Sequence, residues 1–141
     1  MSDRNVELMF RWFEAFNARD VEAAIALCDP SGVFISTFAV GGAAVYQGCD
    51  GMRSYFGDLA EAWGDEIRLE PEAYFDLGEH TLAFSVSRGR GRYSGAEVAM
   101  RVASVARWRA GRMVYLKGYA RREEALRDLG VSEDELEPIA P

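Results

Sequence analysis

Hydrophobic and polar residues alternate along most of residues 81–120, a pattern that predicts β-strands. Two short glycine-containing stretches, residues 94–96 and 109–111, interrupt the alternation. Such stretches connect neighbouring antiparallel strands, so this part of the chain is predicted to form two hairpins in tandem. Three strands of this length make one strongly curved sheet, against which the rest of the chain is expected to pack.

The residues before this sheet repeat their apolar positions every three or four residues, as helices with one buried face do. Predicted helices cover the chain up to about residue 18, residues 21–28 with Asp20 as N-cap, and a third stretch between Gly48 and Gly64. A turn is expected at residues 29–32, a strand at 33–38 and a loop at 39–45. Residues 66–75 predict a strand in which Pro71 favours an edge position or a bulge.

Residues 122–129 predict a last helix, ended by Gly130, and Ser132 begins a capping-box pattern. The resulting order is two helices, a strand, a helix, four strands and a helix. This order favours an α+β fold with three helices of the N-terminal half on the concave face of a mainly antiparallel sheet. One domain over residues 1–141 is expected, with loose tails at about 1–5 and 138–141.

Composition narrows the class of protein. With 49% hydrophobic residues in 141, the chain can bury one sizeable core without disulfides or metal. A net charge of −7 argues against nucleic acid as a partner. The lack of a long apolar run and of a signal-peptide pattern predicts no membrane association and a cytoplasmic location. One histidine and scattered acids offer no ligand set, so neither a metal nor a cofactor is expected.

Strand pairing predicts which side chains share a cavity. A three-residue loop at 109–111 would place Trp108 opposite Arg112 and Ser104 opposite Leu116, and a similar loop at 94–96 would place Val86 opposite Ser104. The more apolar face is expected to meet the helices and leave a cone-shaped hole, unless aromatic side chains fill it. The candidate pocket residues are Trp12, Phe16, Ser36, Tyr46, Tyr55, Trp63, Phe84, Val86, Arg88, Met100, Val102, Ser104, Leu116 and Gly118.

The opposite face of the hairpins, which includes Ala103, Val105 and Tyr119, mixes small, aromatic and basic residues, as a face that packs on a second subunit does. Arg88 and Arg90 are predicted to point inward near the open end of the sheet. A buried arginine needs an anion. Either Asp50, Asp58 or Glu70 supplies it as a structural ion pair, or Arg88 binds the carboxylate of an apolar ligand.

Three segments carry a likeness to a known family: residues 11–20 with 26–27, residues 46–52, and residues 107–114. In this order and spacing, the chain resembles the nuclear transport factor 2-like superfamily, and within it the SnoaL-like and ketosteroid isomerase-like proteins. The resemblance implies a cone-like α+β barrel, commonly a homodimer through the outer sheet face. It also implies a pocket that hosts isomerases, cyclases, epoxide hydrolases and non-catalytic proteins, so that fold alone does not give function.

The family's catalytic groups are missing at the matching positions. An isomerase of this family would have a tyrosine and two aspartates where this chain has Trp12, Ser36 and Ser104, and neither serine can replace a carboxylate base. Gly118 stands where the epoxide hydrolases have an aspartate. Glu14, Glu70 or Asp58 would have to enter the pocket to supply a base.

Other reactive groups do not fill this gap. His80 is expected at a loop tip on the surface, and Cys49 has no histidine partner nearby, which favours a structural role over a reactive thiol. Two hypotheses follow: an isomerase or cyclase acting on a hydrophobic carbonyl compound, or a non-catalytic dimeric binding or interaction protein. Either would use a small apolar or acidic molecule as its ligand.

Overall fold

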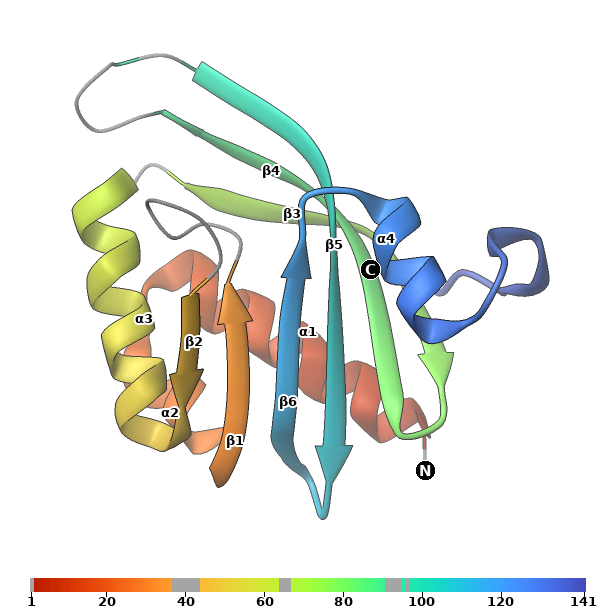
Figure 1. The fold of residues 1–141 in the computed structure, drawn as a ribbon, viewed down its shortest axis with the longest axis horizontal. Helices are drawn as coiled ribbons and strands as arrows, with labels where there is room; N and C mark the ends of the chain where they lie inside the picture. The colour runs from red at the N-terminus through yellow and green to blue at the C-terminus, as the bar shows by residue number, and fades with distance from the viewer. Residues whose placement is uncertain (1, 37–43, 64–66, 91–94, 96) are drawn as a thin grey trace.

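The structure is a computed structural model and describes residues 2–36, 44–63, 67–90, 95 and 97–141. These residues form a curved six-stranded sheet with four α-helices and one 3-10 turn (Figure 1). The elements are α1 (Ser2–Ala18), α2 (Val21–Ala26), β1 (Cys28–Ser36), β2 (Ala44–Gln47), α3 (Gly48–Trp63), β3 (Arg68–Leu77), β4 (His80–Arg90), β5 (Glu97–Arg109), β6 (Arg112–Tyr119), α4 (Arg122–Leu129) and η1 (Glu133–Glu135).

The strand order is β2-β1-β6-β5-β4-β3, which leaves β2 and β3 as the two edges. Neighbouring strands are antiparallel except β1 and β6, which run parallel. The predicted α+β class and mainly antiparallel curved sheet are therefore confirmed. Among the described residues, no helix combines the length and the apolarity that crossing a bilayer requires.

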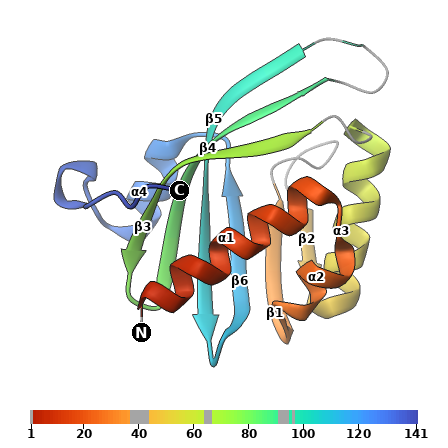
Figure 2. The same ribbon diagram turned by 180° about the vertical axis from the view of Figure 1, so that it is seen from behind.

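Helices α1, α2 and α3 pack on one face of the sheet, as predicted, with α1 lying across the strands (Figure 2). They form the main apolar core together with the side chains that the sheet presents on this face. Helix α4 packs on the opposite face and buries a second apolar cluster. This cluster consists of Phe75, Leu82, Phe84, Ala103, Val105, Tyr119 and Ala125.

The cluster under α4 covers part of the outer face that was expected to be free for a second subunit. Ala103, Val105 and Tyr119 were expected on a surface available to a second subunit, but α4 of the same chain covers them. Dimerisation through the outer face stays a prediction. The surface left for it is the part of the sheet that α4 does not cover.

Local signals in the N-terminal half are mostly confirmed. Asp20 caps α2 by accepting a hydrogen bond from the backbone N–H of Ala23 at 3.1 Å. Helix α2 ends at Ala26, earlier than expected, because Cys28 already belongs to β1. The turn expected at 29–32 was wrong, since these residues belong to β1 and the pairing with β6 shifts its register between Cys28 and Val33.

The expected loop at 39–45 is also partly wrong. Ala44 and Val45 begin strand β2, which pairs with β1, whereas residues 39–43 lie outside the described residues. Pro71 behaves as expected: β3 is an edge strand and its register against β4 shifts between Pro71 and Ala73.

The C-terminal end is held more firmly than predicted. Gly130 ends α4 in the left-handed conformation, and Ser132 and Glu135 form the expected capping box. Beyond them, Ile139 exchanges two backbone hydrogen bonds with Tyr74 at 2.9 and 2.7 Å. The expectation of a loose tail over 138–141 was therefore wrong at Ile139, which extends the edge of the sheet beside β3.

Candidate functional site

A small cavity lies between the first and third helices and the sheet. Its walls are residues of α1, β1, β2, α3, β3, β5 and β6, namely Trp12, Phe34, Ile35, Ser36, Tyr46, Tyr55, Leu69, Ser104, Leu116 and Gly118. The space open to the centre of a water molecule is about 20 Å³. Since one water needs about 10–15 Å³ on this measure, the cavity has room for a water or for one small group of a ligand.

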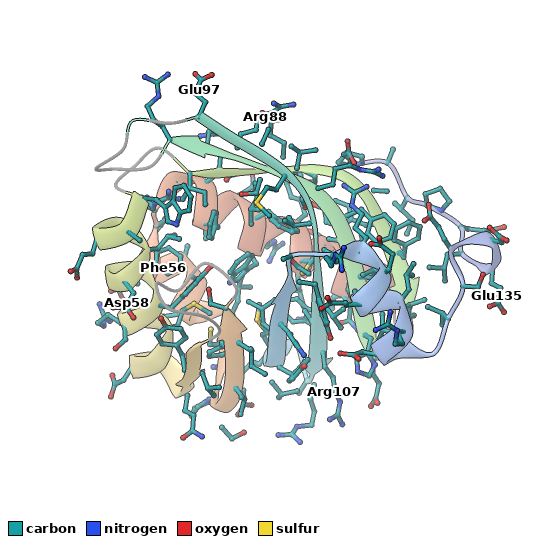
Figure 3. The ribbon with its side chains drawn as sticks, turned by 45° about the horizontal axis from the view of Figure 1, so that its top comes forward. Phe56, Asp58, Arg88, Glu97, Arg107 and Glu135 are labelled. Atoms are coloured by element: carbon teal, nitrogen blue, oxygen red, sulfur yellow. The ribbon has the colours of Figure 1, made fainter. Side chains whose placement is uncertain are left out.

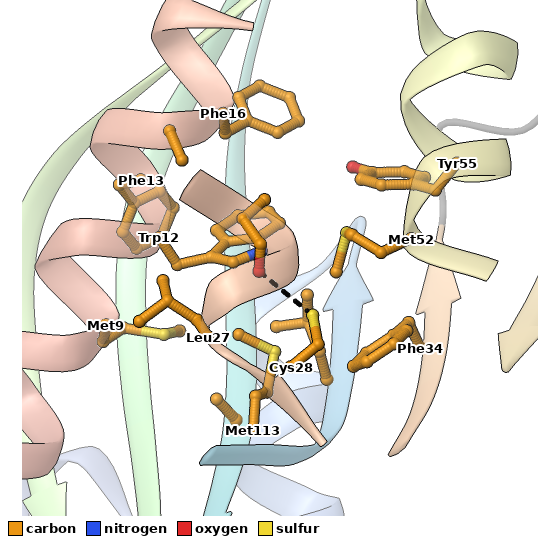
Figure 4. Close-up of a cluster of buried hydrophobic side chains, with 14 of the residues drawn as sticks. Met9, Trp12, Phe13, Phe16, Leu27, Cys28, Phe34, Met52, Tyr55 and Met113 are labelled. Carbon is orange, nitrogen blue, oxygen red and sulfur yellow. Dashed lines mark hydrogen bonds between the residues drawn. The ribbon is translucent and has the colours of Figure 1, made fainter. Parts of the chain in front are cut away.

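Four of the ten wall residues are aromatic, and two of these, Trp12 and Tyr55, belong to the apolar stripes of α1 and α3. Trp12 and Phe16 are one helical turn apart on α1, and their ring centroids lie 5.4 Å from each other. The ring centroid of Tyr55 on α3 lies 6.4 Å from that of Phe16 (Figure 4). It lies 5.5 Å from the ring centroid of Tyr46 on β2. The sheet leaves room opposite these rings, because Ser104 and Gly118 are paired across β5 and β6 and both are small.

The polar groups of the cavity are hydroxyls. The hydroxyls of Ser36 and Tyr55 form a hydrogen bond, and burial raises the pKa of Tyr55 in spite of it. Tyr46 donates to Asp58 Oδ2 at 2.6 Å, and burial together with this hydrogen bond raises the pKa of Tyr46 to about 12. Both phenols are therefore neutral near pH 7, and neither can supply a phenolate base there.

One further polar group in the walls has no partner. The side chain of Trp12 is almost completely buried, at 2% exposure, and its Nε1 finds no acceptor among the described residues.

Seven of the fourteen candidate pocket residues line this cavity: Trp12, Ser36, Tyr46, Tyr55, Ser104, Leu116 and Gly118. Three others, Phe16, Trp63 and Val102, lie in the apolar core that surrounds it. Met100 is exposed on β5 and does not line the cavity. The remaining three, all on β4, lie on the other face of the sheet.

The position of β4 corrects the predicted hairpin register. Val86 lies opposite Arg101, where Ser104 was expected. The observed partner lies three residues before the expected one along β5. A register shift by an odd number of residues turns every side chain of a strand to the opposite face. Phe84 accordingly belongs to the cluster under α4, whereas Ser85 and Ser87 are buried on the face that meets the helices.

Arg88 consequently does not line this cavity. It is more than half exposed on the outer face and pairs with Glu70 through a contact of 2.5 Å between Nε and Oε1. In Figure 3, Arg88 and Glu97 point away from the molecule at the outer end of the β4–β5 hairpin. The expected ion pair with one of the neighbouring acids is present, but as a surface pair, and Arg90 forms a similar one with Glu97.

The second hairpin also differs from its predicted register. The connection is a two-residue turn, Ala110-Gly111, with φ angles of 53° and 77°. Arg109 lies opposite Arg112 and Trp108 opposite Met113, and a bulge next to Trp108 leaves Ser104 opposite Gly118. The bulge restores the inward direction of Leu116, so this residue reaches the cavity although its predicted partner was wrong.

Three wall residues were not predicted. Phe34 shares the buried face of β1 with Ser36, so strict alternation from Ser36 could have found it. Leu69 could not be placed by alternation from the rest of β3, because the bulge after Pro71 changes the face of the residues on its two sides. Ile35 is half-buried beside the cavity, and no sequence signal distinguishes it.

No acid lines the cavity among the described residues. Glu14 is exposed on α1, Glu70 is paired on the outer face, and Asp58 is exposed on α3 and reaches the cavity only through Tyr46. In the same part of the chain, no group of three or more histidine, cysteine or acidic side chains could hold a metal ion. Burial raises the pKa of the Cys28 thiol to about 12, which makes it unreactive.

The curved sheet with helices on its concave face and a cavity between them defines a ketosteroid isomerase-like, nuclear transport factor 2-like fold. Within this class, the sequence model of the SnoaL-like domain matches residues 10–116, and the chain belongs to that family. No curated protein matches the chain.

Solved structures with the same fold cover almost the whole chain. A nuclear transport factor 2-like protein of unknown function from Burkholderia pseudomallei K96243 is 21% identical, with a TM-score of 0.76 over 90% of this chain and 97% of the other. A hypothetical protein of ketosteroid isomerase-like fold from Catenulispora acidiphila DSM 44928, in complex with trimethylamine, is 16% identical, with a TM-score of 0.73 over 91% and 95%. TerC, co-crystallised with polyporic acid, is 17% identical, with a TM-score of 0.72 over 89% and 97%. At these identities the likeness shows the fold alone.

Proposed function

We propose that the protein binds a small, mainly apolar and uncharged molecule in the cavity between α1, α3 and the sheet. The observation that carries this proposal is the chemistry of the walls, which among the described residues are apolar or aromatic with a few neutral hydroxyls. Binding sites for small molecules commonly combine an apolar lining with a few placed polar groups.

An uncharged ligand is favoured over a carboxylate because the one arginine expected to bind an acid lies outside. Arg88 is on the outer face and paired with Glu70. Moving a carboxylate from water into a lining without a cation carries a large desolvation penalty. A hydroxyl, ether or carbonyl group, in contrast, can be satisfied by the Ser36–Tyr55 pair or by Ser104.

Binding without proton-transfer catalysis is favoured for a related reason. An isomerase or cyclase of this fold would need a base, and the described residues that line the cavity offer neither a carboxylate nor a phenolate near neutral pH. The related structures that contain trimethylamine and polyporic acid support a role for this fold in holding small molecules.

The small volume of the cavity limits the size of a ligand that can bind without a change in the walls. A space of about 20 Å³ holds one small group, so a larger ligand has to displace wall side chains as it enters. Movement of the buried wall side chains Leu69 and Leu116 to other rotamers would supply this space.

The experiment is a thermal-denaturation screen with matched pairs of flat apolar compounds, each acid beside its neutral amide. A ligand at about 100 times its Kd adds roughly 2.7 kcal/mol of stability, which raises Tm measurably. The parent is compared with Gly118→Val, which fills the cavity from β6, and with Arg88→Ala as the matched control on the outer face.

The neutral members are expected to raise the Tm of the parent and of Arg88→Ala but not of Gly118→Val. Stabilisation by acids alone, lost in Arg88→Ala, would place the site on the outer face and contradict the proposal. A screen in which no compound shifts the parent would equally count against a small-molecule function for the cavity.

A further inference from the structure

A second hollow lies on the outer face of the sheet, where it crosses β3, β4 and β5 near the outer end of the β4–β5 hairpin. Its charged walls are three arginines and two glutamates, namely Arg68, Glu70, Arg88, Arg90 and Glu97. We call this hollow the arginine groove. The space open to the centre of a water molecule is about 370 Å³, compared with about 20 Å³ in the cavity between α1, α3 and the sheet. The arginine groove is therefore large enough for a small molecule.

Two of these arginines face each other across neighbouring strands. Arg68 on β3 and Arg88 on β4 are direct partners in the antiparallel register, so their side chains leave the same face of the sheet side by side. Like charges at directly opposite positions destabilise a sheet. An anion bound between the two guanidiniums would remove this repulsion, which makes the pair a candidate anion site.

The glutamates of the groove neutralise only two of the three arginines. Arg88 Nε contacts Glu70 Oε1 at 2.5 Å, and Arg90 contacts Glu97 Oε1 at 2.6 Å. Arg68 forms no ion pair with the described residues. All four paired side chains are at least half exposed, and exposed ion pairs contribute little to stability. An anion can therefore replace a glutamate beside its arginine with little loss.

A fourth arginine borders the groove. Arg101 is exposed on β5, two residues beyond the groove wall Ala99 and on the same face. The pKa of Glu72 is lowered mainly by its hydrogen bond from Arg122. The charges of Arg101 and Arg88 lower this pKa further, so both guanidiniums lie near one carboxylate. Positive charge thus gathers on this face of a protein whose net charge is −7, and such a concentration attracts anions.

We propose that the arginine groove binds a phosphate group, held between Arg68 and Arg88. A guanidinium presents its N–H donors in a planar fork that matches two oxygens of a phosphate, and a phosphate has enough oxygens for two forks at once. A carboxylate has two oxygens and one charge, so it satisfies one guanidinium but not both. This site is independent of the proposed function, because it lies on the opposite face of the sheet.

The phosphate group can belong to inorganic phosphate or to a phosphate monoester. The volume of about 370 Å³ exceeds what a single phosphate fills, which favours the monoester. The carboxylates of Glu70 and Glu97, once displaced from their arginines, can accept hydrogen bonds from hydroxyls of its organic part.

The experiment titrates the ¹⁵N-labelled protein with glucose 6-phosphate, inorganic phosphate or glucose at pH 8 and low ionic strength, and follows the amide resonances of β3 and β4 by NMR. Kd values are measured for the parent, Arg68→Gln and Glu70→Gln, two substitutions at exposed positions. Arg107→Gln is the matched control for the change in net charge. Arg107 is also an exposed arginine of the sheet, but it lies at the other end of the molecule from Arg88 (Figure 3).

Glucose 6-phosphate is expected to bind the parent and Arg107→Gln equally, and Arg68→Gln about 10–100-fold more weakly, the effect of one hydrogen bond to a charged group. Glu70→Gln should bind it up to about 5-fold more tightly than the parent, because the carboxylate that competes for Arg88 is removed. Glucose should not bind. Tighter binding of glucose 6-phosphate than of inorganic phosphate assigns the groove to a monoester, and equal binding assigns it to the free ion.

The proposal is wrong if neither phosphate compound binds the parent. It is also wrong if Arg107→Gln loses as much affinity as Arg68→Gln, since binding would then reflect the overall charge of the protein. Gly118→Val should keep the affinity of the parent for glucose 6-phosphate. A loss in this variant would place the phosphate in the cavity between α1, α3 and the sheet and contradict the assignment to the arginine groove.

Discussion

Asn17 and Leu69 exchange two hydrogen bonds: the side-chain amide of Asn17 donates to the Leu69 carbonyl at 2.9 Å, and the Leu69 N–H donates to Asn17 Oδ1 at 2.8 Å. Leu69 belongs to the edge strand β3 and is also a wall of the cavity. One side chain at the end of α1 thus satisfies both backbone groups of this residue and fixes a cavity wall to the helix that carries Trp12.

The same edge is covered at two other points. Arg19 donates to the Ile67 carbonyl at 2.6 Å, and Ile139 pairs with Tyr74. An edge strand with free backbone groups can pair with another chain, and covering it with a helix or a loop prevents this. Residues at the end of α1 and Ile139 near the C-terminus therefore cover β3, and the two hydrogen bonds with Tyr74 hold Ile139 in place.

Asn17→Ala is expected to destabilise the protein by about 1–3 kcal/mol, because it leaves the partly buried Leu69 N–H and carbonyl without partners. Urea denaturation at pH 7 measures the change, and amide exchange at Leu69 should accelerate in the variant. Asn5→Ala is the matched control, since Asn5 donates a single exposed hydrogen bond to the Gly78 carbonyl. A loss in Asn17→Ala no larger than in Asn5→Ala would contradict the role assigned to Asn17.

The sequence alone predicted the helices and strands and half of the candidate pocket residues, because these depend on local signals. The caps at Asp20 and Gly130 and the edge position of Pro71 each follow from the chemistry of one residue and its neighbours. The helix stripe that carries Trp12 and Phe16 follows from a period of 3.6 residues in the same way.

Which side chains of β4 face the helices could not be predicted in this way. The answer depends on the number of residues that connect β4 to its partner strand β5. A loop longer or shorter by one residue sends Val86 and Arg88 to the other side of the sheet. The apolar pattern of β4 does not prevent this error, because both faces are covered. Phe84 packs under α4 while Ser85 is buried on the opposite face.

Ala110→Asn is expected to stabilise the protein by about 0.5–1 kcal/mol. Ala110 and Gly111 have φ angles of 53° and 77°, the two positive angles that a type I′ hairpin turn needs. An alanine at positive φ is strained, whereas asparagine tolerates this conformation and Asn-Gly is the preferred pair. The midpoint of urea denaturation should rise while its slope stays constant.

The exposed residue Ala120 supplies a control, because it is not among the residues with positive φ. Ala120→Asn should not stabilise the protein. A loss of stability in Ala110→Asn would show that the turn does not keep this geometry in solution.

Arg122 links α4 to the outer face of the sheet. Its guanidinium donates to the carbonyls of Val102 and Ser85 at 3.1 and 2.8 Å, lies 4.7 Å from the centre of the Phe84 ring, and contacts Glu72 Oε1 at 2.6 Å. The hydrogen bond from Arg122 holds the pKa of Glu72 below its ordinary value. The contribution of the Arg122–Glu72 ion pair to the packing of α4 on the sheet therefore depends on pH.

The sign of the pH effect follows from the lowered pKa. A carboxylate whose pKa is lower in the folded state stabilises the protein above the pKa of the unfolded chain and loses this contribution as the pH falls through the folded value. Glu72→Gln is thus expected to be less stable than the parent at pH 7, and the difference should shrink as the pH falls below about 4.5, the ordinary value for this group. Urea denaturation between pH 7 and pH 3 measures both curves.

Asp29 and Asp128 also have lowered pKa values, because Ser31 and Tyr119 donate hydrogen bonds to them, so the parent and Glu72→Gln should both lose stability in acid. Only the difference between the two curves reports on Glu72. In the Arg122→Met background, Glu72→Gln should have almost no effect at any pH, since the partner is absent and the double-mutant cycle removes the other contributions. If Glu72→Gln destabilises the Arg122→Met protein as much as the parent, Glu72 acts through a different contact and α4 is not held by this pair.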